Sequence, residues 1–253
     1  MARSKSQNPV REVTVQMPVS GSPASRFDAL CSASRLPRNE TTALALPPVA
    51  AQALSDLLPL LLCGEASAEV VFTEAVEALP ETVGPALRSE LKQIAKDEFH
   101  HGRWLATLRD RLPPPTDGDG ALRAAHFLRK LQSRDLGVQL ARVAALDAGA
   151  CQIFKELMQP GTVTSQYAGL ANLFRRLLRD EGRHVRVTTR CAAALGVSSE
   201  RMKVERQEVW RRLAKLLTPG AQAFRSLGVD VRHLLDHLTM VDPGSAIRIR
   251  TGA

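Results

Sequence analysis

The feature that most constrains the fold of this chain is a short motif that occurs twice. Residues 97–101 read Asp-Glu-Phe-His-His, and residues 180–184 read Asp-Glu-Gly-Arg-His, so both follow the pattern Asp-Glu-x-x-His. A glutamate and a histidine three residues apart project from the same face of an α-helix. Each motif therefore predicts a helix that presents one carboxylate and one imidazole in the same direction.

The match between the two regions extends upstream of the motifs. Glu65 and Asp147 each precede the sequence Ala-x-Ala, and a phenylalanine follows each acid by seven residues. Glu98 lies 33 residues after Glu65, and Glu181 lies 34 residues after Asp147. This spacing predicts two helical hairpins of the same design, in which an acid on the first helix faces Glu-x-x-His on the second.

Two such hairpins packed together would bring four carboxylates and two imidazoles into one core. Buried carboxylates repel one another strongly unless cations neutralise them. Two divalent ions balance the charge of four carboxylates, and a mixed set of carboxylate and imidazole ligands suits iron or manganese. The repeat therefore predicts a site for two metal ions.

The rest of the chain favours an all-α fold. Ala, Leu and Arg dominate, whereas Tyr occurs once and Trp twice, a composition that favours helices over sheets. The apolar residues follow a helical period from residue 49 onward. Prolines and glycines divide this part of the chain. The predicted helices span residues 50–79, 83–112, 121–159, 164–196, 199–217 and 228–241.

Three local signals refine these boundaries. Pro59 lies inside the first predicted helix, so we expect either a kink there or a short preceding helix. Gly196 is expected to end the fourth helix. Ser198 or Ser199 is expected to cap the fifth.

The repeated pattern resembles that of the ferritin-like diiron carboxylate superfamily. The pattern of that family is a Glu, a Glu-x-x-His, a third acid and a second Glu-x-x-His on four successive helices. The resemblance covers residues 50–196 and implies an antiparallel four-helix bundle with two iron ions, with manganese as an alternative at one position and dioxygen as co-substrate. The metal ligands that it implies are Glu65, Glu98, His101, Asp147, Glu181 and His184.

Several acidic residues near these positions have more than one interpretation. Glu69 lies one turn beyond Glu65 and is a further candidate ligand. Glu156 competes with Asp147, but nine residues turn it about 180° away on an ideal helix, so Asp147 is preferred. In the family, an acid at the position of Asp97 or Asp180 often bonds the imidazole of the opposite helix. The alternative for both is a surface ion pair with a nearby arginine, such as Arg103 or Arg183.

The predicted organisation has three parts. Residues 1–47 contain five prolines and are expected to form a poorly ordered N-terminal tail. Residues 48–198 are expected to form the ferritin-like bundle with its dimetal site. Residues 199–253 are expected to form a C-terminal extension of two helices.

Charge and cysteine usage bear on partners and location. The net charge of +8 comes from the ends of the chain, because the charges of residues 41–200 cancel. Basic ends suit nucleic acid, but solubilising ends are the commoner case. A secretory signal is not expected, because residues 1–10 are polar and basic. A transmembrane span is not expected either, because no apolar stretch of about 18 residues lacks charge. The four cysteines lie far apart, which fits reduced thiols in the cytoplasm.

The resemblance implies a non-haem diiron oxygenase or oxidase. Its substrate is expected to be a small biosynthetic molecule that is hydroxylated or N-oxygenated, with electrons from a reductase or ferredoxin and a homodimer as one oligomeric form. Leu177 stands where the diiron arylamine N-oxygenases have a third histidine, so that subgroup fits poorly. A tRNA-modifying diiron hydroxylase and ferritin-like iron storage are the alternatives. Residues expected near an apolar pocket are Ala68, Phe72, Ala150, Cys151 and Phe154.

Overall fold

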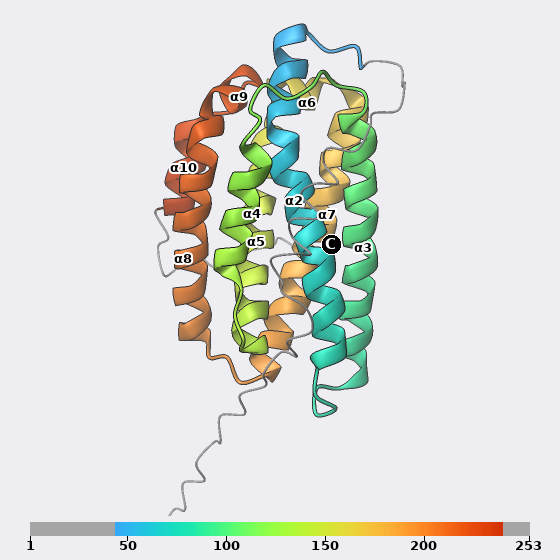
Figure 1. Ribbon diagram of the computed structural model, residues 1–253, viewed down its shortest axis with the longest axis vertical. Coiled ribbons are helices and arrows are strands. Elements are labelled where there is room, and N and C mark those ends of the chain that lie inside the picture. Colours follow the sequence, from blue (N-terminus) through green and yellow to red (C-terminus); the bar gives the residue numbers. More distant parts are fainter. Residues whose placement is uncertain (1–43, 240–253) are drawn as a thin grey trace, which may run out of the picture.

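The computed structural model describes residues 44–239, in which helices are the only regular secondary structure. The all-α prediction is therefore confirmed for this part of the chain. Four long helices run side by side (Figure 1): α2 (Pro48–Ala78), α3 (Pro85–Arg109), α5 (Leu136–Leu157) and α7 (Ala168–Ala194). The shorter elements are α4 (Gly120–Leu131), α6 (Val163–Gln166), α8 (Ser199–Leu217), a 3-10 turn (Thr218–Gly220), α9 (Ala221–Ser226) and α10 (Val231–Thr239).

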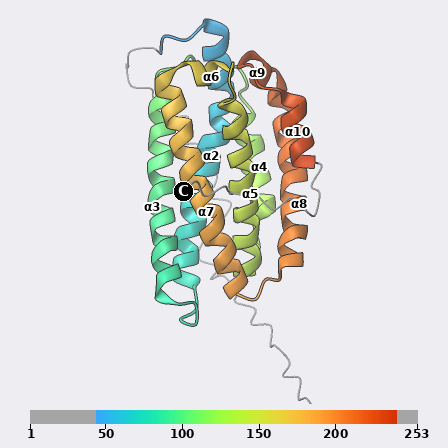
Figure 2. The ribbon, with the colours of Figure 1, turned by 180° about the vertical axis from the view of Figure 1, so that it is seen from behind.

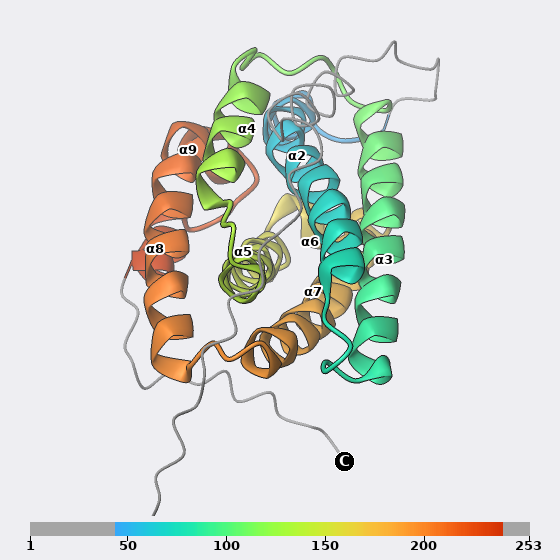
Figure 3. The same cartoon turned by 60° about the horizontal axis from the view of Figure 1, so that its bottom comes forward.

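The long helices pack as two hairpins. Helix α2 packs against α3, α5 packs against α7, and α3 also contacts α7. Helices α4 and α9 pack on α2, whereas α8 and α10 pack on α5. Figures 2 and 3 show that these additional helices gather on the α2/α5 side, and that no described helix covers the outer side of α3 and α7.

The prediction of a single helix over residues 121–159 is wrong. The chain leaves the helix after Leu131 and starts a new one at Leu136. The carboxylate of Asp135 accepts a hydrogen bond of 2.8 Å from the backbone N–H of Val138, which caps α5. The capping signal was present in Asp135, but the apolar period on both sides concealed the break.

Other local predictions have mixed outcomes. Helix α2 continues through Pro59, so the alternative of a short preceding helix is wrong. Ser198 caps α8 by accepting a 3.2 Å hydrogen bond from the backbone N–H of Arg201. Gly196 follows α7 with a φ of 89°, in the left-handed region where glycine is favoured.

The structure describes neither end of the chain, because residues 1–43 and 240–253 lie outside the described range. The C-terminal extension has one more short helix than predicted, because α9 precedes α10. Residues 240–241 of the last predicted helix and residues 1–43 of the predicted tail lie outside the described residues. Leu44 and Leu46 pack against the core just before α2 begins.

The core consists of two apolar clusters at different heights along the long helices. The first contains Leu54, Leu58, Leu105, Phe154 and Phe174. The second contains Phe72, Leu91, Ile94, Leu140 and Cys191. The acids and histidines of the repeat come between these two sets on all four helices, so apolar packing above and below separates them from water.

Helix α2 is the one described helix that is long and apolar enough to cross a membrane. In its most apolar window, 61% of the residues are buried inside the fold, as expected of a core helix. Among the described cysteines, Cys63, Cys151 and Cys191 are buried free thiols. Burial, together with the nearby charges of Glu181 and Asp147, raises the pKa of Cys151 to about 12, so this thiol is inert at neutral pH.

Candidate metal centre

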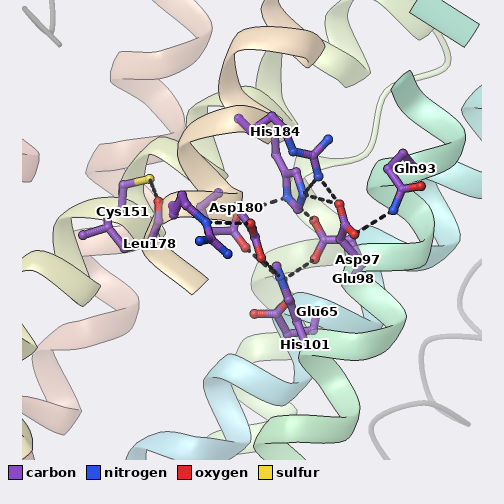
Figure 4. Close-up of polar contacts among 12 residues, drawn as sticks. Glu65, Gln93, Asp97, Glu98, His101, Cys151, Leu178, Asp180 and His184 are labelled. Atoms are coloured by element: carbon purple, nitrogen blue, oxygen red, sulfur yellow. Dashed lines mark hydrogen bonds and ion pairs between the residues drawn. The ribbon is translucent and has the colours of Figure 1, made fainter. Parts of the chain in front are cut away.

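Six side chains of the repeat converge in the middle of the four long helices. Figure 4 shows Glu65, Glu98, His101 and His184 among them. None of them is more than 7% exposed. Their donor atoms fall into two groups, each compact enough to hold one metal ion, and Glu181 belongs to both. The first group is Glu65, Glu98, His101 and Glu181, and the second is Asp147, Glu181 and His184.

The Nδ1 atoms of both imidazoles face the carboxylates. His101 Nδ1 lies 3.1 Å from an oxygen of Glu65 and 3.3 Å from an oxygen of Glu181. His184 Nδ1 lies 2.9 Å from Glu98 and 3.6 Å from Glu181. The two ring centroids are 5.6 Å apart. The two groups are therefore adjacent, and Glu181 reaches both of them.

The opposite ring nitrogens face a second pair of acids in a crossed arrangement. His184 Nε2 on α7 lies 3.4 Å from Asp97 on α3. His101 Nε2 on α3 lies 3.5 Å from Asp180 on α7. Asp97 also pairs with Arg183. Asp97 therefore makes both of the contacts considered for it, one with the imidazole of the opposite helix and one with an arginine.

Buried polar atoms without partners test whether the site fits metal ions. Glu98 Oε1, Asp147 Oδ2 and His184 Nδ1 are buried and make no hydrogen bond to any residue that the structure describes. The approach of His184 Nδ1 to Glu98 Oε1 is short but lies outside hydrogen-bond geometry. Buried polar groups are normally satisfied. Oxygen and nitrogen donors aimed at a common space without protein partners are what metal ligands provide, so the residues fit divalent ions.

The carboxylates respond unequally to their surroundings. Burial raises the pKa of Glu65 well above its usual value, and the charge of Glu98 adds to the shift. Burial and the charge of Glu181 likewise raise the pKa of Asp147. Burial also acts on Glu98, but the contacts with His101 and His184 outweigh it and bring its pKa to about 2. Without cations, this cluster therefore retains protons on some of its carboxyls.

Without cations, the two imidazoles also hold protons. Burial lowers the pKa of His184, but this effect is outweighed by contacts with Asp97, Glu181 and Glu98, which raise the pKa to about 12. Burial also lowers the pKa of His101, and contacts with Glu181 and Glu65 outweigh that effect and raise this pKa above its usual value. Cations entering the site must displace these protons.

The remaining acidic candidates lie outside both groups. Glu69 is only partly buried, and burial together with the charge of Glu98 raises its pKa. Glu156 points elsewhere, with one oxygen 3.1 Å from His233 Nδ1. The choice of Asp147 over Glu156 therefore agrees with the geometry. Leu177 is fully buried in the core.

A cavity of about 60 Å³ adjoins the carboxylates on the α2/α5 side. Among the described residues, the carboxylates of Glu65, Glu98, Asp147 and Glu181 form its only polar lining. Of the residues expected at an apolar pocket, Phe72 and Cys151 do not line it. The apolar lining is Leu60, Leu61, Gly64, Ala68, Phe127, Leu128, Leu146, Ala150, Ile153, Phe154 and Leu213.

Sequence reasoning missed the contributions of α4 and α8 to this lining. Phe127 and Leu128 come from α4, and Leu213 comes from α8. The strongly amphipathic pattern of residues 120–131 was an available signal that this segment covers an apolar surface. The repeat contained no information on which helix would cover the site.

The chain matches no protein-family model, no curated protein and no solved structure. Its function is therefore inferred from the geometry of the metal centre and the surfaces around it.

Proposed function

We propose that this protein is a ferritin-like four-helix-bundle enzyme that binds two iron ions and activates dioxygen to oxidise a small apolar substrate. The observation that carries the proposal is the pair of adjacent donor groups, which share Glu181 and have a buried imidazole in each half. Carboxylate-rich sites with one histidine for each metal ion suit iron, and manganese is the alternative at one position.

The residues of the site have distinct tasks in this proposal. Glu65 and Asp147 each serve one half of the centre, whereas Glu98 and Glu181 lie close to both imidazoles. Asp97 accepts the Nε2 proton of His184, which leaves Nδ1 of that ring to bind metal. Asp180 lies 3.5 Å from Nε2 of His101 and would orient that ring in the same way once a metal ion occupies the Nδ1 side. When bound, ferrous iron supplies the electrons that reduce dioxygen.

Asp147 and the cavity together favour an enzyme. Aspartate is one methylene shorter than the usual glutamate, so it leaves room on the cavity side of its half of the site. No basic side chain of residues 44–239 lines the cavity, so it suits an uncharged apolar group. Apolar walls next to the carboxylates also exclude water from the reacting centre.

Oxygen uptake by the anaerobically loaded ferrous protein tests this proposal against iron storage. An enzyme without substrate and reductant is expected to consume about one dioxygen per two ferrous ions and then stop, because its ligands hold both ions. The Asp147→Glu variant is expected to bind iron but to react more slowly, because the longer side chain occupies the space beside the cavity. Continued uptake with a growing soluble ferric mineral would instead establish storage.

A further inference from the structure

We propose that the exposed face of α3 and α7 is the docking surface for an acidic electron-transfer protein, and that Trp104 is the point where electrons enter. The inference rests on the proposed function, because an oxygen-activating iron centre needs a reductant. The proposed docking surface lies on the side of the histidines, opposite the cavity. No described helix covers this side.

Trp104 connects the metal centre to the surface. Its ring centroid lies 5.5 Å from that of His101, so the indole is in contact with a candidate metal ligand. The indole is half-buried and therefore reaches the outside of α3. The guanidinium of Arg176 on α7 lies 3.9 Å from the ring centroid, which holds the indole in place through a cation–π contact. A redox-active side chain thus lies between solvent and the metal centre.

The surface around Trp104 is basic even though the charges of residues 41–200 cancel in the sequence. The metal-site acids of the repeat are inside the fold, whereas most of the basic residues of α3 and α7 are exposed. Asp97 and Asp180 are mostly buried, and each has an oxygen close to a histidine. Helix α7 alone carries six arginines: Arg175, Arg176, Arg179, Arg183, Arg186 and Arg190.

Two of these arginines, Arg175 and Arg176, are available to a partner. Arg179 pairs with Asp180, Arg183 pairs with Asp97, and Arg190 pairs with Glu90. Arg175 bonds only the neutral side chain of Asn172. Among the described residues, no carboxylate lies within ion-pairing distance of Arg175 or Arg176. Unneutralised exposed charge of one sign steers partners of the opposite sign to a surface.

The position of this surface favours a redox protein over RNA. An RNA substrate must bring its reacting base to the metal centre, and the cavity that adjoins the centre opens among apolar residues of the α2/α5 side. The basic surface lies on the opposite, histidine side. An electron donor needs no cavity, because it only has to approach the indole. Each reduced ferredoxin would give up one electron and reduce one ferric ion to ferrous, with no bond made or broken.

The test uses a plant-type [2Fe–2S] ferredoxin, an acidic one-electron donor, as the probe. Its binding to the full-length protein is measured by calorimetry with and without iron, at low and high salt. The variant Arg175→Glu/Arg176→Glu is expected to weaken binding about tenfold or more. The matched control is Arg225→Glu/Arg232→Glu, which makes the same charge change on exposed residues of α9 and α10 and is expected to bind like wild type.

Electron transfer is then measured on the ferric protein without oxygen. At saturating ferredoxin, Trp104→Phe is expected to be reduced by the bound ferredoxin more slowly than wild type, whereas dithionite reduces both proteins equally fast. No binding of ferredoxin to wild type, or wild-type binding by Arg175→Glu/Arg176→Glu, would overturn the docking surface. Equal rates for Trp104→Phe and wild type would overturn electron entry at Trp104. Loss of tRNA binding in the double variant, with unchanged ferredoxin binding, would make this a nucleic-acid surface.

These outcomes are separable from failure of the proposed function. Ferredoxin binding to the metal-free protein reports on the surface alone. A chain that binds no iron would contradict the dimetal centre while the docking result stands on its own.

Discussion

The carboxylate of Asp97 on α3 lies 3.4 Å from Nε2 of His184 on α7, so an acid from one half of the repeat orients an imidazole of the other half. Although burial acts against it, this contact is the main cause that brings the pKa of Asp97 down to about 2. The carboxylate is therefore ionised at neutral pH and accepts the Nε2 proton. The two halves of the repeat depend on each other through this contact.

Asp97→Asn is therefore expected to weaken iron binding by about 10–100-fold, because an amide orients the imidazole less strongly and lowers its basicity. The matched control is Asp236→Asn, which changes an exposed carboxylate on α10. Anaerobic titration with ferrous ion measures both affinities. Equal affinities in the two variants would show that Asp97 does not support the site.

Metal affinity is expected to rise with pH. In the metal-free protein, the pKa values of Glu65 and Asp147 are raised above their unfolded values. Protons on these two carboxyls therefore stabilise the metal-free fold at low pH, and this stabilisation is lost progressively as pH rises above about 4. The raised pKa of His184 acts in the same direction above about pH 6.5. Glu98, with a lowered pKa, changes the stability only at acidic pH.

The difference in Tm between the iron-loaded and metal-free protein is thus expected to widen between about pH 5.5 and about pH 8. Calorimetry in buffers of different ionisation enthalpy should also detect the protons released when iron binds. A difference in Tm that narrows over this range would contradict the assigned protonation of the cluster.

The repeat was sufficient to predict which side chains meet, because Glu-x-x-His has only one geometry on a helix and the matched spacings put Glu65 and Asp147 at the same height. The break before Asp135 was missed for a physical reason. Apolar residues continue at helical spacing on both sides of it, and the break is stabilised by hydrogen bonds from the backbone to the side chains of Ser133, Asp135 and Gln139. The sequence also could not predict the cavity, since Phe127 and Leu213 approach it through tertiary packing of α4 and α8.

The total charge was similarly misleading about the surface. The charges of residues 41–200 cancel as a sum, yet Glu98 and Glu181 are buried, whereas Arg175 and Arg176 are exposed. Segregation of charge between inside and outside depends on the fold and does not appear in a count of residues.

Filling the cavity is expected to separate substrate access from metal binding. Ala150 lines the cavity, so Ala150→Leu should occupy most of its space. Xenon, a small apolar probe that enters dry cavities, is expected to bind wild type and the control Ala193→Leu, whose exposed residue lies on α7. It should not bind Ala150→Leu. Retained xenon binding in that variant, measured by xenon NMR, would place the apolar space elsewhere.

Anaerobic ferrous titration, with Mössbauer spectroscopy of the loaded protein, tests the dimetal centre most directly. Wild type is expected to bind about two ferrous ions per chain in adjacent positions. The double variant Glu98→Ala/Glu181→Ala is expected to bind none, because it removes both carboxylates that lie close to the two imidazoles. The control Glu74→Ala/Glu77→Ala, on the more exposed face of α2, should bind like wild type. Unchanged iron content in Glu98→Ala/Glu181→Ala would contradict the dimetal centre.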